Sequence, residues 1–158
     1  MRDPLTQPEQ LIRQVYSYVA YRIGAGADAE DVTGETFERA VRYRDSFDGA
    51  RGTPLVWLLG IARNVLAGRY GAVLVDPEAE LEGESPGFDE AVASKLDLEA
   101  ALACLSDRER ELISLRYSAD LSSKQIGSVL GLEPGTVDVS LHRAKARLRA
   151  FLGETVAP

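Results

Sequence analysis

The chain of 158 residues carries 25 acidic and 18 basic side chains, a formal net charge of −7, which argues against a protein that binds nucleic acid alone, because neutralising phosphates normally requires a basic surface. Its single histidine, His142, and single cysteine, Cys104, exclude a disulfide and a Cys/His metal cluster and leave no nucleophile–base pair, so we expect no enzymatic activity, no metal and no cofactor. With no secretory signal and no apolar run near the roughly 18 residues that a membrane helix needs, we expect a cytoplasmic protein without a membrane segment.

Three helices are predicted within the first 72 residues. The first spans residues 9–23, where apolar side chains recur at helical intervals, and Gly24-Ala25-Gly26 ends it. We expect Asp28 to cap the second helix. The buried face of this helix should consist of Val32, Phe37, Ala40 and Val41. The third helix runs from Pro54 to about Tyr70, because Thr53-Pro54 is a strong pair of cap and first-turn residues.

An acidic stretch follows these helices. Residues 73–89 read VLVDPEAELEGESPGFD, without a sustained apolar period. Residues 73–99 hold nine acidic side chains and one basic one, so most of the excess negative charge lies here. We expect residues 73–96 to form a flexible acidic linker between two small helical domains.

The segment after the linker, residues 97–153, predicts a helix-turn-helix within a second helical domain. Ser106 and Glu109 form a capping box, and so do Ser122 and Gln125, which open two successive helices. Gly131 suits a left-handed backbone at the end of the second of these helices, and Pro134 suits the first turn of the next one. That last helix has an apolar stripe made of Val137, Leu141, Ala144, Leu148 and Phe151. The fold class is therefore all-α, with Cys104 expected in the core.

The opposite face of the last helix carries several basic side chains. One interpretation is a helical hairpin with an ordinary solvated basic face. The other is a DNA-reading helix-turn-helix, which the preceding capped helix favours because it completes a four-helix unit.

Several stretches of the chain carry a resemblance to a known family. They read DAEDVTGETFERA at residues 28–40, DSFDGARGTPLVWLLGIARN at 45–64 and LSDRERELISLRY at 105–117, with the helix-turn-helix after them. Together they resemble the two domains of bacterial RNA polymerase sigma factors of the extracytoplasmic-function (ECF) group of the sigma-70 family. The resemblance implies a chain that binds core RNA polymerase, recognises promoter DNA with both domains and helps to open the duplex. It assigns residues 1–72 to a region 2-like domain and residues 97–153 to a region 4-like domain.

The same resemblance implies roles for individual residues. The polymerase-docking helix would present Asp31, Glu35, Thr36, Phe37 and Arg39. The promoter −10 element would be contacted by Arg51, Trp57, Arg63 and Asn64, with Trp57 either a stacking platform or a core residue. The −35 element would be contacted by Arg116, Lys124, Thr136, Asp138, Val139, Ser140, Arg143 and Lys145. The resemblance also implies an anti-sigma factor as a partner.

The sequence departs from the family pattern at three places. Gly34 stands where glutamine is common, Asp138 begins a run that is often basic, and Arg69-Tyr70-Gly71 replaces an arginine-rich helix end.

Two other classes of protein remain possible from the sequence. A stand-alone helix-turn-helix regulator would explain residues 105–152 but not 28–70, whereas a protein that only sequesters another transcription component leaves the basic stripe unexplained.

Overall fold

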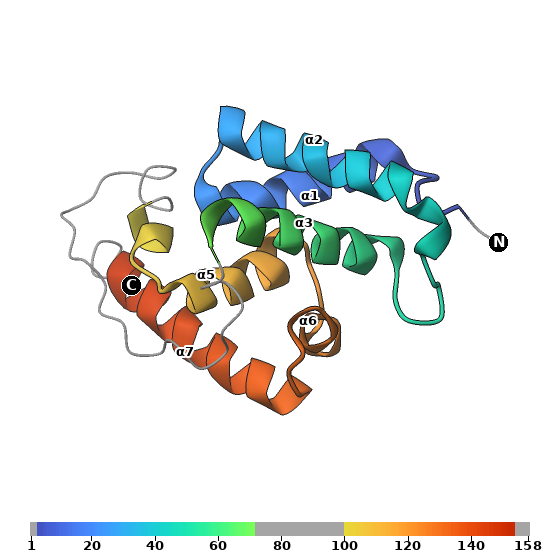
Figure 1. The fold of residues 1–158 in the computed structure, drawn as a ribbon. Helices are drawn as coiled ribbons and strands as arrows, with labels where there is room; N and C mark the ends of the chain where they lie inside the picture. The colour runs from blue at the N-terminus through green and yellow to red at the C-terminus, as the bar shows by residue number, and fades with distance from the viewer. Residues whose placement is uncertain (1–2, 72–99, 154–158) are drawn as a thin grey trace.

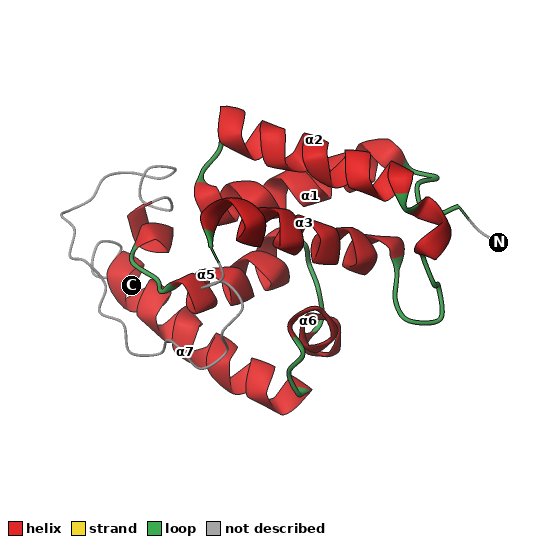
Figure 2. Cartoon of the chain, viewed as in Figure 1, coloured by secondary structure: helices red, strands yellow, loops and turns green. Residues whose placement is uncertain are grey.

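The computed structural model describes residues 3–71 and 100–153 of the chain, and every regular element within these two ranges is helical (Figures 1 and 2). The expectation of an all-α fold is thereby confirmed. The expected acidic linker, residues 73–96, lies outside the described residues. None of the described helices combines the length and apolarity needed to cross a bilayer.

Residues 3–71 form a unit of three main helices, which we call the N-terminal unit. Helices α1 (Pro8–Ile23), α2 (Ala27–Arg42) and α3 (Pro54–Tyr70) lie against one another, with the short helix η1 (Arg44–Ser46) after α2 (Figure 1). Thr53 caps α3 as expected, since its hydroxyl accepts a hydrogen bond of 3.2 Å from the Val56 amide. This unit matches the three predicted helices closely in its bounds.

Two predictions for α2 are wrong. The helix begins at Ala27 after Gly26, whose positive φ of 136° turns the chain, and no side chain caps it. Asp28 instead lies in the first turn, where its charge complements the helix dipole. Val41 is 54% exposed, because it lies one residue beyond Ala40 and so about 100° off the buried stripe. That stripe consists of Ala29, Val32, Thr33, Thr36 and Ala40.

Residues 100–153, the C-terminal unit, contain the predicted helix-turn-helix. After a helical stretch at residues 100–103, α5 (Asp107–Ile113) runs directly into a π-helical turn, η3 (Ser114–Ser118), and α6 (Ser123–Leu130) and α7 (Pro134–Gly153) follow. Both predicted capping boxes are present, at the starts of α5 and α6. Gly131 has a left-handed φ of 74°, and α7 begins at Pro134, so the sequence-based account of this turn is confirmed.

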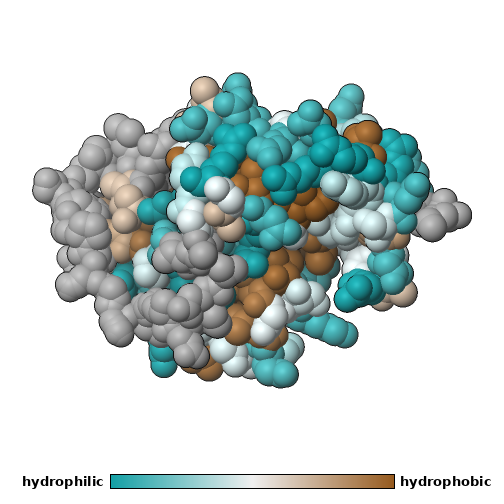
Figure 3. Space-filling view, in the orientation of Figure 1, coloured by the Kyte–Doolittle hydropathy of each residue, from teal (hydrophilic) through white to brown (hydrophobic). Residues whose placement is uncertain are grey.

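The two units share one hydrophobic core. Helix α1 packs against α5 and η3, and α3 packs against α6, so the buried residues of both units form a single cluster. Val15, Tyr18 and Val19 of α1 are completely buried. Figure 3 shows apolar residues between the hydrophilic surfaces of the upper and lower helices. The units are therefore held in a closed arrangement in this structure.

Gly127 in α6 provides a test of the turn. A Cβ atom there would lie 2.4 Å from the Leu132 carbonyl oxygen, which belongs to backbone and cannot rotate away. We expect Gly127→Ala to lower the free energy of unfolding by about 1–3 kcal/mol through overpacking. Urea denaturation followed by circular dichroism would measure the change.

Gly60→Ala is the matched control, because a Cβ there meets nothing within 4 Å in the interior of α3. It should raise the free energy of unfolding by about 0.5–1 kcal/mol, since alanine loses less backbone entropy in a helix. Equal effects of the two substitutions would contradict the close approach of α6 to Leu132.

Candidate functional site

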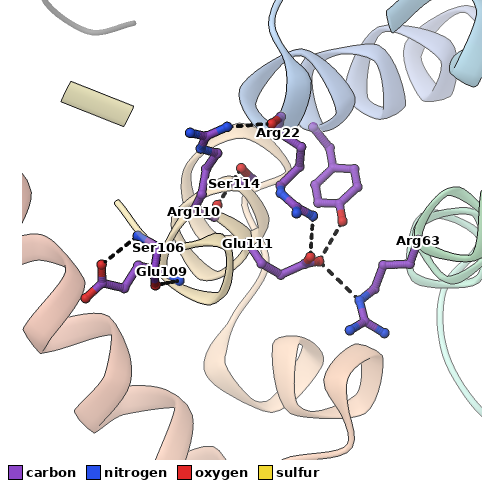
Figure 4. Close-up of polar contacts among 8 residues, drawn as sticks. Arg22, Arg63, Ser106, Glu109, Arg110, Glu111 and Ser114 are labelled. Atoms are coloured by element: carbon purple, nitrogen blue, oxygen red, sulfur yellow. Dashed lines mark hydrogen bonds and ion pairs between the residues drawn. The ribbon is translucent and has the colours of Figure 1, made fainter. Parts of the chain in front are cut away.

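A buried carboxylate joins the two units. Glu111 projects from α5 and is 1% exposed. Its oxygens accept bonds of 2.6 Å from the Tyr18 hydroxyl, 2.5 Å from Arg22 Nη1 and 3.2 Å from Arg63 Nε (Figure 4). All three donors belong to the N-terminal unit, so one side chain of the C-terminal unit is bound by the other unit.

Regular helix geometry positions these donors. Tyr18 and Arg22 are four residues apart on α1 and therefore lie on one face, while Arg63 approaches from α3. Arg110, next to Glu111, adds bonds of 2.8 Å to the Arg22 carbonyl and 3.1 Å to the Leu102 carbonyl. The contact thus combines side-chain charge pairs with backbone carbonyls of both units.

The pKa shifts agree with a buried cluster of charges. Burial, reinforced by Glu111, raises the pKa of Tyr18 well above its ordinary value. Burial alone would lower the pKa of Arg22, but Glu111 and Tyr18 outweigh it and the pKa is raised. Burial and the neighbouring Arg22 lower the pKa of Arg110. Arg22 therefore stays charged opposite Glu111, because anionic attraction exceeds desolvation.

The residues expected to dock on polymerase lie partly on one surface of α2. Asp31 is exposed, and Glu35 accepts bonds of 2.8 Å from Arg39 and 2.9 Å from Arg69 of α3. These charges line a surface depression of about 470 Å³. The hydrogen bond from Arg69 is the main reason that the pKa of Glu35 is lowered. Arg69 was not among the expected docking residues, although it fixes one of them.

Two of the expected docking residues do not share this surface. Thr36 is 0% exposed, and its hydroxyl donates to the Val32 carbonyl over 2.8 Å. Phe37 is half-buried against the core. Their direct environment is therefore the interior of the N-terminal unit.

Two of the four residues expected at the −10 element lie together, since Arg51 and Trp57 line one cavity of about 160 Å³. Arg51 and Asn64 are exposed, whereas Trp57 packs edge-on against Phe47 with ring centroids 5.3 Å apart. The side chain of Arg63 is only 13% exposed and forms an ion pair with Glu111. The loop before α3, which contains Arg51, faces Lys124 of α6 across a cavity of about 690 Å³.

Most of the expected −35 residues are at least partly exposed, and two of them, Arg116 and Asp138, also take part in hydrogen bonds between helices. Thr136, Val139 and Arg143 are exposed on α7, with Ser140 and Lys145 partly so, and Lys124 is exposed on α6. Arg116 donates to the Leu121 carbonyl over 3.0 Å and to the Ser123 hydroxyl over 2.6 Å. That hydroxyl in turn donates to the Asp138 carboxylate. Arg116, Ser123 and Asp138 thus connect α6 to α7, a role the sequence analysis did not assign.

Sequence analysis also assigned no role to Tyr18, Arg22 or Glu111. A signal for the first two existed, because Tyr18 and Arg22 continue the stripe of Val15 and Val19 on the buried face of α1. Glu111 likewise lies four residues before the buried Leu115 and therefore on the same helix face. Charged residues at such positions indicate buried partners, but the pattern does not identify them.

Comparison with known proteins assigns both units. Residues 9–70 match the family model for Sigma-70 region 2, and residues 95–148 match the model for Sigma-70, region 4. The ECF RNA polymerase sigma factor SigL of Mycobacterium tuberculosis is 31% identical over 147 residues, which cover 89% of this chain and 83% of SigL. The ECF sigma factor BldN of Streptomyces coelicolor is 31% identical over 156 residues, which cover 91% of this chain but 58% of BldN.

Two solved structures share the fold. The sigma factor RpoE of Bartonella quintana, in complex with the anti-sigma factor NepR, has a TM-score of 0.72 at 22% identity and covers 91% of this chain and 92% of its own. CnrH, in complex with the cytosolic domain of CnrY, has a TM-score of 0.66 at 24% identity, with coverages of 95% and 85%. On the matched regions and the relatives above, the chain belongs to the ECF RNA polymerase sigma factors of the sigma-70 family.

The contact between Arg69 and Glu35 provides a test of the charged surface on α2. We expect Arg69→Gln to raise the pKa of Glu35 toward the ordinary value, because the hydrogen bond that stabilises the carboxylate is lost. Carbon-detected NMR titration of the side-chain carboxyl would measure it. Arg13→Gln, an exposed change on α1, is the control and should leave that pKa where it is. An unchanged Glu35 titration in Arg69→Gln would show that the bond does not persist in solution.

Proposed function

We propose that this protein binds core RNA polymerase and directs it to promoters, with the N-terminal unit docking on polymerase and reading the −10 element while the C-terminal unit reads the −35 element. The observation that carries the proposal is the pairing, in one chain, of a region 2 unit with a helix-turn-helix whose α7 exposes Thr136, Val139 and Arg143. We propose the residue limits 1–72 and 97–153 for the two domains and 73–96 for the linker.

The docking surface would be the charged side of α2. Asp31, Glu35 and Arg39 supply alternating charges, and Arg69 holds Glu35 in place. Such a pattern suits an interface that orients a partner, because complementary charges fix register and speed association. Thr36 and Phe37 would support this surface from beneath it.

Contacts to the −10 element would come from Arg51 and Asn64, which are exposed. Asparagine can bond base edges and arginine the phosphate backbone. Trp57 would act chiefly through its packing on Phe47. Arg63 would join the DNA-contacting set only when it no longer pairs with Glu111.

Contacts to the −35 element would come from the N-terminal turns of α7. Thr136, Val139 and Ser140 would face bases, while Arg143 and Lys145 would approach phosphates. Lys124 would add a backbone contact from α6. Arg116 and Asp138 would contribute by holding α6 against α7 through Ser123.

We further propose that the protein acts in the cytoplasm without an enzymatic step of its own, and that an anti-sigma factor regulates it. The closed arrangement of the two units supports such a partner. An anti-sigma factor that binds the closed form more tightly than an open form would shift the protein toward the closed form.

Run-off transcription with purified core polymerase is the direct test. We expect a transcript from a cognate promoter when the protein is added, and weak binding of the same duplex by the protein alone in a mobility-shift assay, because its net charge is −7. Tight, sequence-specific binding without polymerase at physiological salt would instead indicate a stand-alone regulator. Capture of another transcription protein with no transcript would indicate a sequestering protein.

Two substitutions should separate the promoter elements. Arg143→Ala removes a charge aimed at phosphate, so promoter use should fall for all sequences alike and the salt slope should fall by about one. Asn64→Ala removes a base-edge contact, so it should alter −10 preference and leave −35 preference intact. Sequencing transcripts from a randomised promoter library would measure both. A change of −35 preference in Asn64→Ala would overturn the assignment of units to elements.

A further inference from the structure

Three side chains of the N-terminal unit converge on one anion in this structure. The Tyr18 hydroxyl, Arg22 Nη1 and Arg63 Nε all donate to the carboxylate of Glu111 (Figure 4). We call these three residues the anion site of the N-terminal unit. Two guanidinium groups and a hydroxyl form a site that accepts a carboxylate or a phosphate, because both present oxygens that take charge-assisted hydrogen bonds.

The occupant of the anion site comes from the other half of the same chain. Glu111 lies on α5, 93 residues from Tyr18 and 48 residues from Arg63 in sequence. In this arrangement the side chain of Arg63, which we expect to contact the −10 element, is 13% exposed. The proposed −35 residues Thr136 and Arg143 are meanwhile open to solvent.

We propose that Glu111 is an intramolecular anionic plug: in the free protein it holds the two units closed and withholds Arg63 from the DNA backbone, and it must leave the anion site when the protein engages polymerase and promoter. A DNA phosphate then takes the place of the Glu111 carboxylate at Arg63. The inference rests on the proposed function and deepens it, because it names the contact that keeps the free protein from binding.

The chemistry of the cluster suits a contact that opens rather than a permanent one. A buried ion pair is stabilising only when all its hydrogen-bonding groups are satisfied, and Arg22 Nε is buried without a partner among the described residues. Arg63 makes the longest of the three bonds, at 3.2 Å, and lies at the more solvent-accessible edge. We therefore expect release to begin at Arg63, where water or a phosphate first competes with Glu111.

Glu111→Gln tests the plug directly. The neutral amide keeps the shape of the side chain but removes the negative charge that Arg22 and Arg63 share, which is strongly unfavourable for a buried ion pair. We expect the units to separate in the free protein. Glu109→Gln is the matched control, because it makes the same change of charge on the same helix within the C-terminal unit and glutamine preserves the capping box with Ser106.

Double electron–electron resonance between nitroxides at Arg13→Cys on α1 and Ala146→Cys on α7, in a Cys104→Ala background, would measure the arrangement, since Arg13 and Ala146 are exposed. The chain with native Glu111 and the Glu109→Gln control should give one narrow distance distribution. Glu111→Gln should give a longer and broader one. A closed distribution in Glu111→Gln would overturn the plug.

The second readout is the protein concentration that gives half-maximal run-off transcription with core polymerase. If only the open form binds polymerase and promoter, the apparent affinity falls in proportion to the fraction of protein that is open. The Glu111→Gln protein should therefore reach half-maximal transcription at about tenfold lower concentration. Glu109→Gln should match the unsubstituted protein. An open Glu111→Gln protein with an unchanged half-maximal concentration would show that closure does not withhold the binding surface, and would overturn the inference.

Tyr18→Phe provides an independent variant in case Glu111→Gln does not fold, as judged by circular dichroism. It removes one donor, keeps the ring in the core and leaves both arginines on Glu111, so opening and the gain in transcription should be intermediate. No opening in Tyr18→Phe would then count against the plug. Absence of transcript from the unsubstituted protein at any concentration would refute the proposed function instead, and the distance measurement would still test closure by itself.

Discussion

The arrangement of the two units depends on one buried carboxylate. Taking Glu111 and its arginines out of water costs on the order of several kcal/mol per ion, and only close, multiple hydrogen bonds offset that. Tyr18 and Arg22 provide such bonds because they are about one helical turn apart on α1. The helix therefore fixes the position of the two donors relative to each other. The apolar contacts of α1 with η3 give attraction, but they are not directional. Glu111 therefore determines the position of α5 relative to α1 and α3.

The charges on α2 contrast with this cluster. Glu35 also accepts from two arginines, Arg39 and Arg69, yet all three side chains are partly exposed to solvent. Water and salt screen such pairs, so they add little to folding stability. Their value lies in the pattern of charge that they present to a partner. The same kind of bond thus determines the relation between units where it is buried and shapes a recognition surface where it is exposed.

Local features of the sequence predicted the helices well, but the sequence did not predict which distant residues pair with one another. The capping boxes, Gly131 and Pro134 involve residues within a few positions of one another, so spacing alone reveals them. The partners of Glu111 are 48 to 93 residues away, and periodicity indicates which face of a helix is buried without naming what it meets. The prediction for Asp28 was wrong because Gly26 turns the chain two residues before the expected cap. The residue roles taken from the family resemblance stay predictions.

Internal contacts give a second reason, besides the net charge, to expect weak DNA binding by the free chain. Arg22 and Arg63 are paired with Glu111, Arg110 donates to backbone carbonyls, and Arg116 braces the helix-turn-helix through Ser123. An arginine engaged in this way releases few counterions from DNA, because its charge is already neutralised or its donors are occupied. Specific contact with a promoter must then draw on cations that polymerase supplies or on arginines that the chain releases when its two units separate. DNA binding therefore depends on the arrangement of the two units. A few arginines contact either groups of the same chain or DNA, and this choice matters more than the number of basic residues.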